Sequence, residues 1–191
     1  MKVIFLDVDG VLNSYRSYKK TAKHLKRTGE DIVPLEDHMF ELLASLVKET
    51  GAKIVLSSAW RSELINYKED KNHEWMTALL NKFKEFGIPY DLSRTPLLYT
   101  GYRGSEIGAW LFSAISRGEN IESFVILDDD DDMAPLKQFF VQTCPYTGLR
   151  PKNIKRAKFI LDNYKFDPEK YEKHTNIEGA VYFIKKLKIK G

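Results

Sequence analysis

The amino-acid sequence predicts an α/β fold in which a doubly wound parallel sheet carries helices on both of its faces. Three observations lead to this prediction: short apolar runs without breakers, amphipathic segments that alternate with them, and polar residues directly after the runs. Uniformly apolar strands are typical of a parallel sheet with right-handed connections that is covered on both sides. Since 191 residues with 43% hydrophobic content suffice for one core, we expect a single domain over 1–191.

Four segments have the pattern of strands in this sheet. Residues 2–6 (KVIFL) are β-branched and aromatic and lead into DVDG, and 52–57 (AKIVLS) repeats the apolar pattern and leads into the serine pair Ser57 and Ser58. The run at 124–127 (FVIL) leads into an acidic cluster, and 138–143 (QFFVQT) follows it. The segment IPYDL at 88–92 fits a further short strand.

Amphipathic patterns between these segments predict the helices. Proline suits the first turn of a helix and glycine is common just beyond the last, so these residues mark helix boundaries. The expected helices run from Pro34 to Gly51, from 72 to 86, from a Ser105 cap to about Gly118, from 151 to 163 and from 176 to 187.

Charge is unevenly distributed, although the formal net charge is only +3. Residues 14–30 carry six Lys or Arg against one Glu, whereas 128–132 is a run of five Asp. Adjacent carboxylates repel one another unless a cation lies among them, so an acidic run after a buried strand favours a metal site. Asp130 and Asp131 are expected to be mostly solvated.

Several classes of protein lack support in the sequence. No apolar run reaches the roughly eighteen residues of a membrane span, and the N-terminus has no signal-peptide pattern, so we expect a cytoplasmic protein without a membrane partner. The four histidines lack metal-ligand spacing, which argues against zinc, and no GxxxxGK[ST] loop supports a kinase. The lone Cys144 cannot form an internal disulfide and is expected to be buried.

Polar residues that follow the strands are expected to meet at one edge of the sheet. In doubly wound sheets, ligands bind outside the carboxyl ends of the strands, where the strand order switches. Asp7, Asp9, Ser57, Asp128 and Asp129 lie far apart in the sequence but all follow such strand ends. The sequence therefore predicts that they form one site.

Asp7 and Asp9 form a pair of acids, DVDG, at the first strand end. Two carboxylates on one face are costly without a cation, and Mg²⁺ prefers a few carboxylate oxygens together with water and substrate phosphate. Once the charge is neutralised, Asp7 could attack a phosphorus atom, and Asp9 could act as general acid and then as general base. The alternative is that Asp9 and Gly10 merely form a turn.

Hydroxyl and guanidinium groups could supply the contacts to a phosphate. Ser57 and Ser58 could donate hydrogen bonds to a phosphate oxygen, although serines are also common helix caps. Arg103 could pair with the phosphate and with Asp7, or it could lie on a solvated surface.

Further residues are predicted to complete the site. Trp60 and Arg61 could line the substrate entrance, although Trp60 fits the core equally well. Asp132 could support a metal ligand or lie at a helix start. The predicted metal ligands are Asp7, Asp9, Asp128 and Asp129, with the choice of direct ligand between the last two left open, and the predicted substrate-binding residues are Gly10, Ser58 and Arg61.

The motifs FLDVDGVLN, VLSSAWR, a helix start at Arg103 and ILDDDDD occur in the order found in the haloacid dehalogenase (HAD) superfamily. Over residues 3–132 the pattern resembles most the branch associated with multidomain RNA repair proteins, with DGVLN, SSxWR, R-x-x-EI-x-x-W-L and DD. Two departures are Val11 where the superfamily often has Thr, and Arg103 where it usually has Lys. Arginine keeps the positive charge.

This resemblance implies a Rossmann-like HAD core with minimal or no cap, Mg²⁺ as cofactor and a phosphatase that acts through an aspartyl-phosphate. It implies these roles: Asp7 as nucleophile, Asp9 as acid and base, Ser57 as phosphate-binding hydroxyl, Arg103 as stabilising cation, and Asp128 with Asp129 as metal acids.

The short, flap-like insert at about 14–33 bears on the substrate. Because the chain has little room for a cap domain, an open site suits a large substrate. The insert is basic and contains tyrosines, which favours a phosphorylated RNA or DNA end, and hence nucleic acid repair, although such segments are often just solvated. Two alternatives stay open: a phosphatase of small phosphate esters or phosphoproteins, and a non-catalytic Mg²⁺- or nucleotide-binding module, which would not require both Asp7 and Asp9.

Overall fold

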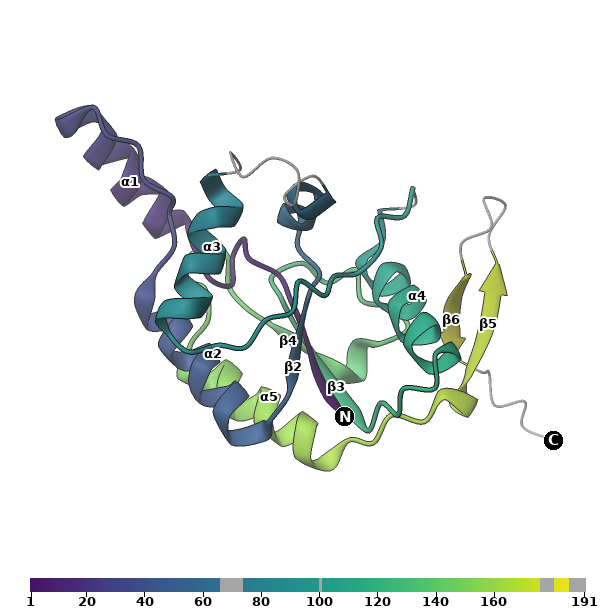
Figure 1. Cartoon of the computed structure of the whole chain (residues 1–191). Helices are drawn as coiled ribbons and strands as arrows, with labels where there is room; N and C mark the ends of the chain where they lie inside the picture. The colour runs from purple at the N-terminus through teal and green to yellow at the C-terminus, as the bar shows by residue number, and fades with distance from the viewer. Residues whose placement is uncertain (66–73, 100, 176–180, 186–191) are drawn as a thin grey trace.

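The computed structural model describes residues 1–65, 74–99, 101–175 and 181–185 of the chain. At its centre is a four-stranded, all-parallel sheet with the strand order β2-β1-β3-β4 (Figure 1). The predicted α/β class with a parallel sheet is therefore confirmed. The strands span Lys2–Leu6 (β1), Lys53–Leu56 (β2), Ser123–Asp128 (β3) and Phe140–Gln142 (β4).

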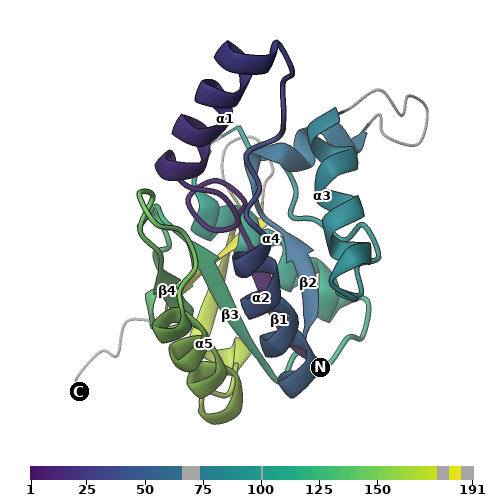
Figure 2. The same ribbon diagram turned by 90° about the vertical axis from the view of Figure 1, so that its left-hand side faces the viewer.

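Helices cover both faces of this sheet, as Figure 2 shows. On one face α2 (Asp37–Thr50) and α5 (Pro151–Asn163) pack against each other, and α4 (Arg103–Ser116) lies on the opposite face. α4 is anchored by Trp110, whose ring meets that of Phe5 edge-on with centroids 5.3 Å apart. This is the doubly wound arrangement that the sequence predicts.

The strand order explains why the helices lie on opposite faces. The chain passes from β1 to β2 through α2, and then crosses back past β1 to β3 through α3 (Glu74–Glu85) and α4. Right-handed connections that run in opposite directions place their helices on opposite faces. The order therefore switches between β1 and β3, where a crevice for a ligand is expected at the carboxyl ends of the strands.

The sheet is buried on both faces. All six residues of β3 and four of the five in β1 are buried. Aromatic rings fill one side of the core, with the Phe124 centroid 5.6 Å from that of Phe5 and 4.1 Å from that of Phe139. Burial of each such side chain contributes about 1.5–3 kcal/mol, which fixes the register that determines where the strands end.

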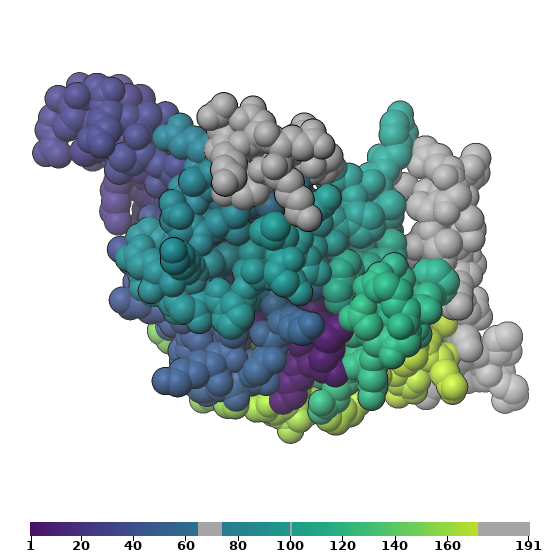
Figure 3. Space-filling view, viewed as in Figure 1, coloured from purple at the N-terminus to yellow at the C-terminus, as the bar shows by residue number. Residues whose placement is uncertain are grey.

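The basic insert forms helix α1 (Tyr15–Thr28), which projects from the body of the molecule (Figure 3). Ser14 caps the helix through a reciprocal pair of hydrogen bonds with Ser17, whose backbone N–H donates to Ser14 Oγ at 3.2 Å. The helix ends at Gly29, where φ is 75°. Most of its side chains are exposed, so few apolar contacts hold this helix to the core.

The predicted C-terminal helix is wrong where the structure describes it. β5 (Tyr171–Thr175) and β6 (Val181–Lys185) form an antiparallel hairpin beside α4. Residues 176–180 and 186–187 of the predicted helix lie outside the described part of the chain. The segment VYFIK is mostly β-branched and aromatic, and this strand propensity outweighs the apparent helical spacing.

Other predictions need smaller corrections. The segment 88–92 forms no strand because Pro89 lacks an N–H donor and Leu92 has a φ of 63°, and Arg94 bridges to Leu56 instead. The predicted strand at 138–143 shortens to β4 because a 3₁₀ turn, η2 (Lys137–Phe139), precedes it. The predicted helix at 151–163 is confirmed as α5.

Two further observations concern composition. Cys144 is exposed, contrary to the expectation of burial, because it lies in the turn that follows β4. Within the described ranges, no helix is long and apolar enough to cross a membrane.

Candidate active site

The strand register brings three of the predicted site residues side by side. Leu6 of β1 is paired with Leu56 of β2 on one side and with Leu127 of β3 on the other. The next residue of each strand is Asp7, Ser57 and Asp128, respectively. Asp7 therefore lies between a hydroxyl group and a second carboxylate at the carboxyl edge of the sheet.

Three carboxylates converge at this edge. One oxygen each from Asp7, Asp128 and Asp129 lies within 4.8 Å of the other two. Asp7 is 5% exposed and Asp128 2% exposed, and Asp128 Oδ2 accepts no hydrogen bond from any described residue. Hard carboxylate oxygens at this spacing fit Mg²⁺, so these three residues could hold the ion.

The electrostatics of this cluster also favour a cation. Burial raises the pKa of Asp7 well above its usual range, and the charge of Asp128 adds to the effect, while Arg103 opposes it. Burial raises the pKa of Asp128 to about 7, again against the effect of Arg103. Burial and the charge of Asp130 raise the pKa of Asp129. A bound divalent cation would restore the charged form of these acids.

Asp9 does not belong to this cluster, and its carboxylate is surrounded by hydrogen-bond donors. Its Oδ1 accepts hydrogen bonds from Asn13 Nδ2 at 2.8 Å and from the Tyr18 hydroxyl at 2.9 Å, and its Oδ2 accepts one from Trp60 Nε1 at 2.9 Å. Trp75 packs against both Tyr18 and Trp60. These contacts fix the carboxylate, and its predicted part in metal binding stays a prediction.

The backbone conformation at residue 10 and the nearby side chain of Asp129 both require glycine at this position. Its φ is 67°, and a Cβ atom there would lie 2.5 Å from the carboxylate carbon of Asp129. Its N–H donates to Asn13 Oδ1 at 2.9 Å, and its carbonyl accepts from Thr143 Oγ1 at 2.7 Å. Only glycine leaves room for Asp129 at this turn.

Arg103 connects the carboxylates to a buried network. Its Nε lies 3.3 Å from Asp128 Oδ2, its Nη2 lies 3.8 Å from Asp7 Oδ1 and its Nη1 donates to Glu106 Oε2 at 3.3 Å. Glu106 also accepts from Arg61 Nη2 at 2.5 Å. Glu106 therefore holds Arg103 in place beside Asp7 and Asp128.

Arg61 is buried rather than open to solvent, at 2% exposure. It donates to the carbonyl oxygens of Ser57 and Ser58, which links the second strand end to Glu106. Burial lowers the pKa of Arg61, and Glu106 counters this effect. In this position Arg61 stabilises the turn formed by Ser57 and Ser58, the serine turn. Its predicted contact with substrate stays a prediction.

The serine hydroxyls differ in their partners. Ser57 Oγ is fully buried and has no hydrogen-bond partner among the described residues. Ser58 Oγ accepts from Trp60 N at 3.3 Å, and the Ser58 hydroxyl also lowers the pKa of Asp7. A buried unpaired hydroxyl is costly, so Ser57 is a group that a ligand oxygen would satisfy.

The remaining acids of the run divide into two groups. Asp130 and Asp131 are exposed, as expected. Asp132 Oδ2 accepts from Arg103 N at 2.9 Å and therefore caps α4. The expected Ser105 cap is wrong, because α4 begins two residues earlier at Arg103.

A family model of the HAD domain in Swiss Army Knife RNA repair proteins matches residues 3–154. The chain belongs to this family. No curated protein and no solved structure matches the chain. The matched range includes the carboxylate cluster, Arg103 and the serine turn, so the site lies entirely within the HAD domain.

Several contacts of this HAD site do not follow from the sequence patterns. The patterns indicate no role for Asn13, suggest only base stacking for Tyr18 as a tyrosine of the insert, and mark Glu106 only as part of a motif. The three-residue spacing of Arg103 and Glu106 on a helix predicts an ion pair. By contrast, the Trp60–Asp9 hydrogen bond joins residues 51 positions apart, and no local pattern predicts it.

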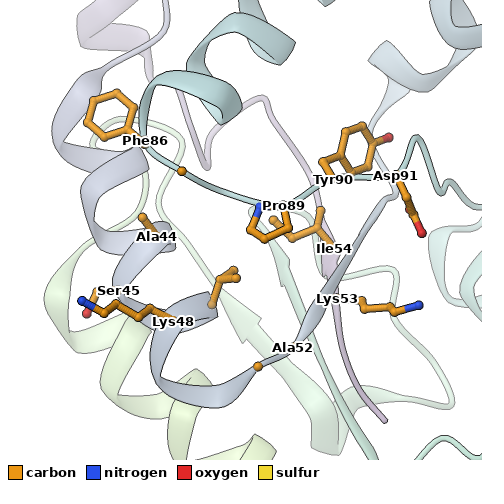
Figure 4. A pocket seen from close by; sticks show the side chains of 13 residues that line it. Ala44, Ser45, Lys48, Ala52, Lys53, Ile54, Phe86, Pro89, Tyr90 and Asp91 are labelled. Carbon is orange, nitrogen blue, oxygen red and sulfur yellow. The ribbon is translucent and has the colours of Figure 1, made fainter.

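A groove of the HAD domain lies away from the candidate active site. It has a volume of about 680 Å³ and lies between α2, the start of β2 and the segment 86–91 (Figure 4). Ala44, Ile54 and Pro89 line it together with other residues, and none of the predicted site residues does.

Proposed function

We propose that this HAD domain is a Mg²⁺-dependent phosphatase that removes a terminal phosphate from a nucleic acid, with Asp7 as nucleophile. The observation that carries the proposal is the convergence of Asp7, Asp128 and Asp129 within 4.8 Å beside Arg103. The hydroxyl of Ser57, which has no partner among the described residues, supports the proposal. Ser57 follows β2, which pairs with the strand that Asp7 follows, so the hydroxyl lies beside Asp7. The site thus combines a buried carboxylate with a guanidinium and a free hydroxyl.

The residues divide into those that hold the cofactor and those that bind the phosphate. Asp7, Asp128 and Asp129 would hold Mg²⁺. The bound ion supplies positive charge, which lowers the repulsion between the carboxylates and a phosphate dianion. Arg103 and the Ser57 hydroxyl would bind phosphate oxygens and so orient the phosphorus toward Asp7.

The proposed reaction has two displacement steps. In the first, an oxygen of Asp7 forms a bond to phosphorus while the bond from phosphorus to the ester oxygen breaks, which gives a phosphorylated Asp7. Asp9 gives a proton to the leaving oxygen. In the second step water attacks the same phosphorus, Asp9 takes a proton from this water, and inorganic phosphate and free Asp7 result. Asn13, Tyr18 and Trp60 orient Asp9 for both transfers.

A nucleic-acid substrate is supported by the helix that leaves the site. α1 begins two residues after Asn13, which contacts Asp9. Its six basic side chains include five that form no ion pair with a described residue. Such unpaired charge attracts a phosphodiester backbone. The five are Arg16, Lys19, Lys23, Lys26 and Arg27.

The test is a phosphate-release assay with Mg²⁺, with EDTA and with Asp7→Asn. Substrates would be an aryl phosphate and RNA and DNA oligonucleotides with a 3′ or a 5′ phosphate. We expect Mg²⁺-dependent release that is fastest on an oligonucleotide and that falls at least about a thousandfold in Asp7→Asn. Lys48→Ala, in the apolar groove, is the matched control with normal release.

Two outcomes would contradict parts of the proposal. Release that is fastest on small esters or phosphopeptides would exclude the nucleic-acid substrate but keep the mechanism. Mg²⁺ or nucleotide binding that persists in Asp7→Asn, with no release from any substrate in the wild type, would indicate a binding module.

A further inference from the structure

Two exposed tyrosine rings stand beside the active site and take no part in the proposed reaction. Tyr15 is 54% exposed and Tyr146 63% exposed, although their ring centroids are only 5.0 Å apart with planes inclined by 50°. Tyr15 N donates to Pro145 O at 2.8 Å, which fixes the first turn of α1 to the loop after β4. The pair is thus a preformed aromatic surface.

This surface is joined directly to the turn after β1, which carries Gly10 and Val11. Thr143 Oγ1 donates to Gly10 O at 2.7 Å, and Leu149 N donates to Val11 O at 2.9 Å. These two bonds hold both ends of the loop that carries Tyr146. A ligand at the tyrosine pair would therefore lie next to the turn that follows Asp7 and Asp9.

A basic pocket of about 200 Å³ opens in the same loop. Arg150 and Lys152 line it together with Cys144 and Gly148, and no acidic residue does. Both basic side chains belong to exposed residues and form no ion pair with a described residue. They lie at the start of α5, where the helix dipole adds positive potential. The pocket therefore suits an anion.

We propose that the tyrosine pair and this pocket form a subsite for the nucleotide next to the phosphorylated end. The base of that nucleotide stacks on Tyr15 and Tyr146, and its phosphodiester group lies beside Arg150 and Lys152. This inference rests on the proposed function and sharpens its substrate to a single strand of at least two nucleotides. A base within a duplex is already stacked and paired, and it would have to lose these interactions before it could lie on the rings, which favours a single strand.

The subsite has a defined pattern of selectivity. Aromatic rings stack on any base, so the subsite does not read sequence. A mononucleotide or an aryl phosphate has no second nucleotide and gains nothing from it. An oligonucleotide gains both a stacked base and a phosphate contact.

The first experiment measures binding apart from catalysis. Asp7→Asn protein in EDTA is titrated into a labelled single-stranded RNA with a terminal phosphate, and fluorescence anisotropy gives Kd. We expect Tyr146→Ala to raise Kd about tenfold, whereas Tyr146→Phe, which keeps the ring, stays within about twofold. The matched control is Phe159→Ala, an exposed ring near the other end of α5, and it leaves Kd within about twofold.

The second experiment tests the pocket through its salt dependence. Lys152→Ala should make the slope of log Kd against log salt shallower by about 0.7, as expected for one lost phosphate contact on a single strand. Lys155→Ala removes an equal charge one turn along α5 and should leave the slope unchanged. Equal slopes for the two variants would overturn the assignment of the pocket.

Other results would overturn the subsite while leaving the proposed function intact. The first is a Kd for Tyr146→Ala equal to that of Phe159→Ala, while the wild type still hydrolyses oligonucleotides fastest. The second is equal affinity for a blunt duplex and for a single strand. The third is tighter binding of a phosphopeptide than of RNA. If instead the wild type hydrolyses only small esters, the proposed function itself fails, and the phosphate-release assay detects this separately.

Discussion

The two ends of the parallel sheet offer a ligand very different surroundings. At the carboxyl end, Asp7, Asp128 and Arg103 meet in a buried cluster of charges. At the other end, the groove of Figure 4 holds about 680 Å³ between α2 and β2, with a largely apolar lining. In this fold the direction of the strands determines where acids gather, because only the carboxyl ends bring acids from several strands together.

The largest expected effect is on the stability of the protein, and it comes from a substitution of Glu106 at the carboxyl end. Glu106→Gln removes the charge that pairs with buried Arg61 and with Arg103. Because this leaves a buried guanidinium without its counter-charge, we expect the free energy of unfolding to fall by about 3 kcal/mol. Urea unfolding measures the change.

The matched control for this prediction is Glu119→Gln, which breaks an exposed ion pair with Arg117 and should cost at most about 0.5 kcal/mol. Equal losses in the free energy of unfolding of the two variants would show that the buried network of Glu106 stabilises the protein no more than an exposed ion pair does.

The next largest effect concerns activity. Arg103→Lys keeps one positive charge but cannot contact Asp7, Asp128 and Glu106 together. We therefore expect kcat to fall about a hundredfold, while Lys48→Ala in the groove leaves kcat unchanged. Steady-state kinetics at saturating Mg²⁺ measure kcat for both variants. An equal loss of kcat in Lys48→Ala would contradict the assignment of the active site to the carboxyl end of the sheet.

The carboxylate cluster should also make stability depend on pH and Mg²⁺. The folded pKa of Asp128 is about 7 against 3.8 for the ordinary group, so the metal-free native state binds more protons than the unfolded state between these values. Stability relative to Asp128→Asn should therefore fall in EDTA as the pH rises from about 4 through about 7.

Mg²⁺ should reverse this loss of stability at pH 8, where the acids are ionised. At a hundred times its Kd, a ligand stabilises by about 2.7 kcal/mol, which corresponds to roughly 5 to 10 °C in Tm. Differential scanning fluorimetry in EDTA across this pH range measures the loss of stability, and the same measurement with Mg²⁺ at pH 8 measures its reversal. A Tm that Mg²⁺ raises equally in the wild type and in Asp128→Asn would place the ion elsewhere.

The smallest predicted effect separates backbone strain from crowding of the site. Gly10→Ala and Gly29→Ala both put a side chain at a positive φ, 67° and 75°, but only Gly10 would press on Asp129. Each should lose about 1 kcal/mol of stability from the backbone. Only Gly10→Ala should also weaken Mg²⁺ binding, by about tenfold in calorimetric titration, and equal Mg²⁺ affinities would contradict the contact with Asp129.

The carboxyl edge of the sheet is predictable from the sequence because local patterns define it. β1 and β3 are uniformly apolar, each is followed by acids, and parallel pairing then brings Asp7 beside Asp128. The bounds of α5 are also predictable, because Pro151 begins the helix and its apolar residues recur with helical spacing.

Contacts between distant segments could not be predicted in this way. Asp9 is held by Tyr18 and Trp60, whose positions depend on how the insert helix and the serine turn pack together. The sequence predicts a helix where β6 lies because a short apolar run such as 181–185 fits both the helical and the strand period, and pairing with Tyr171–Thr175 decides between them.

The most direct test of the account is to find where phosphate is carried during turnover. The protein would be mixed with Mg²⁺ and an RNA oligonucleotide labelled at its terminal phosphate, quenched in acid within the first turnover and mapped by peptide mass spectrometry. We expect phosphate on the peptide that contains Asp7, and none in Asp7→Asn. Turnover without a phosphorylated peptide, or with phosphate on another residue, would contradict it.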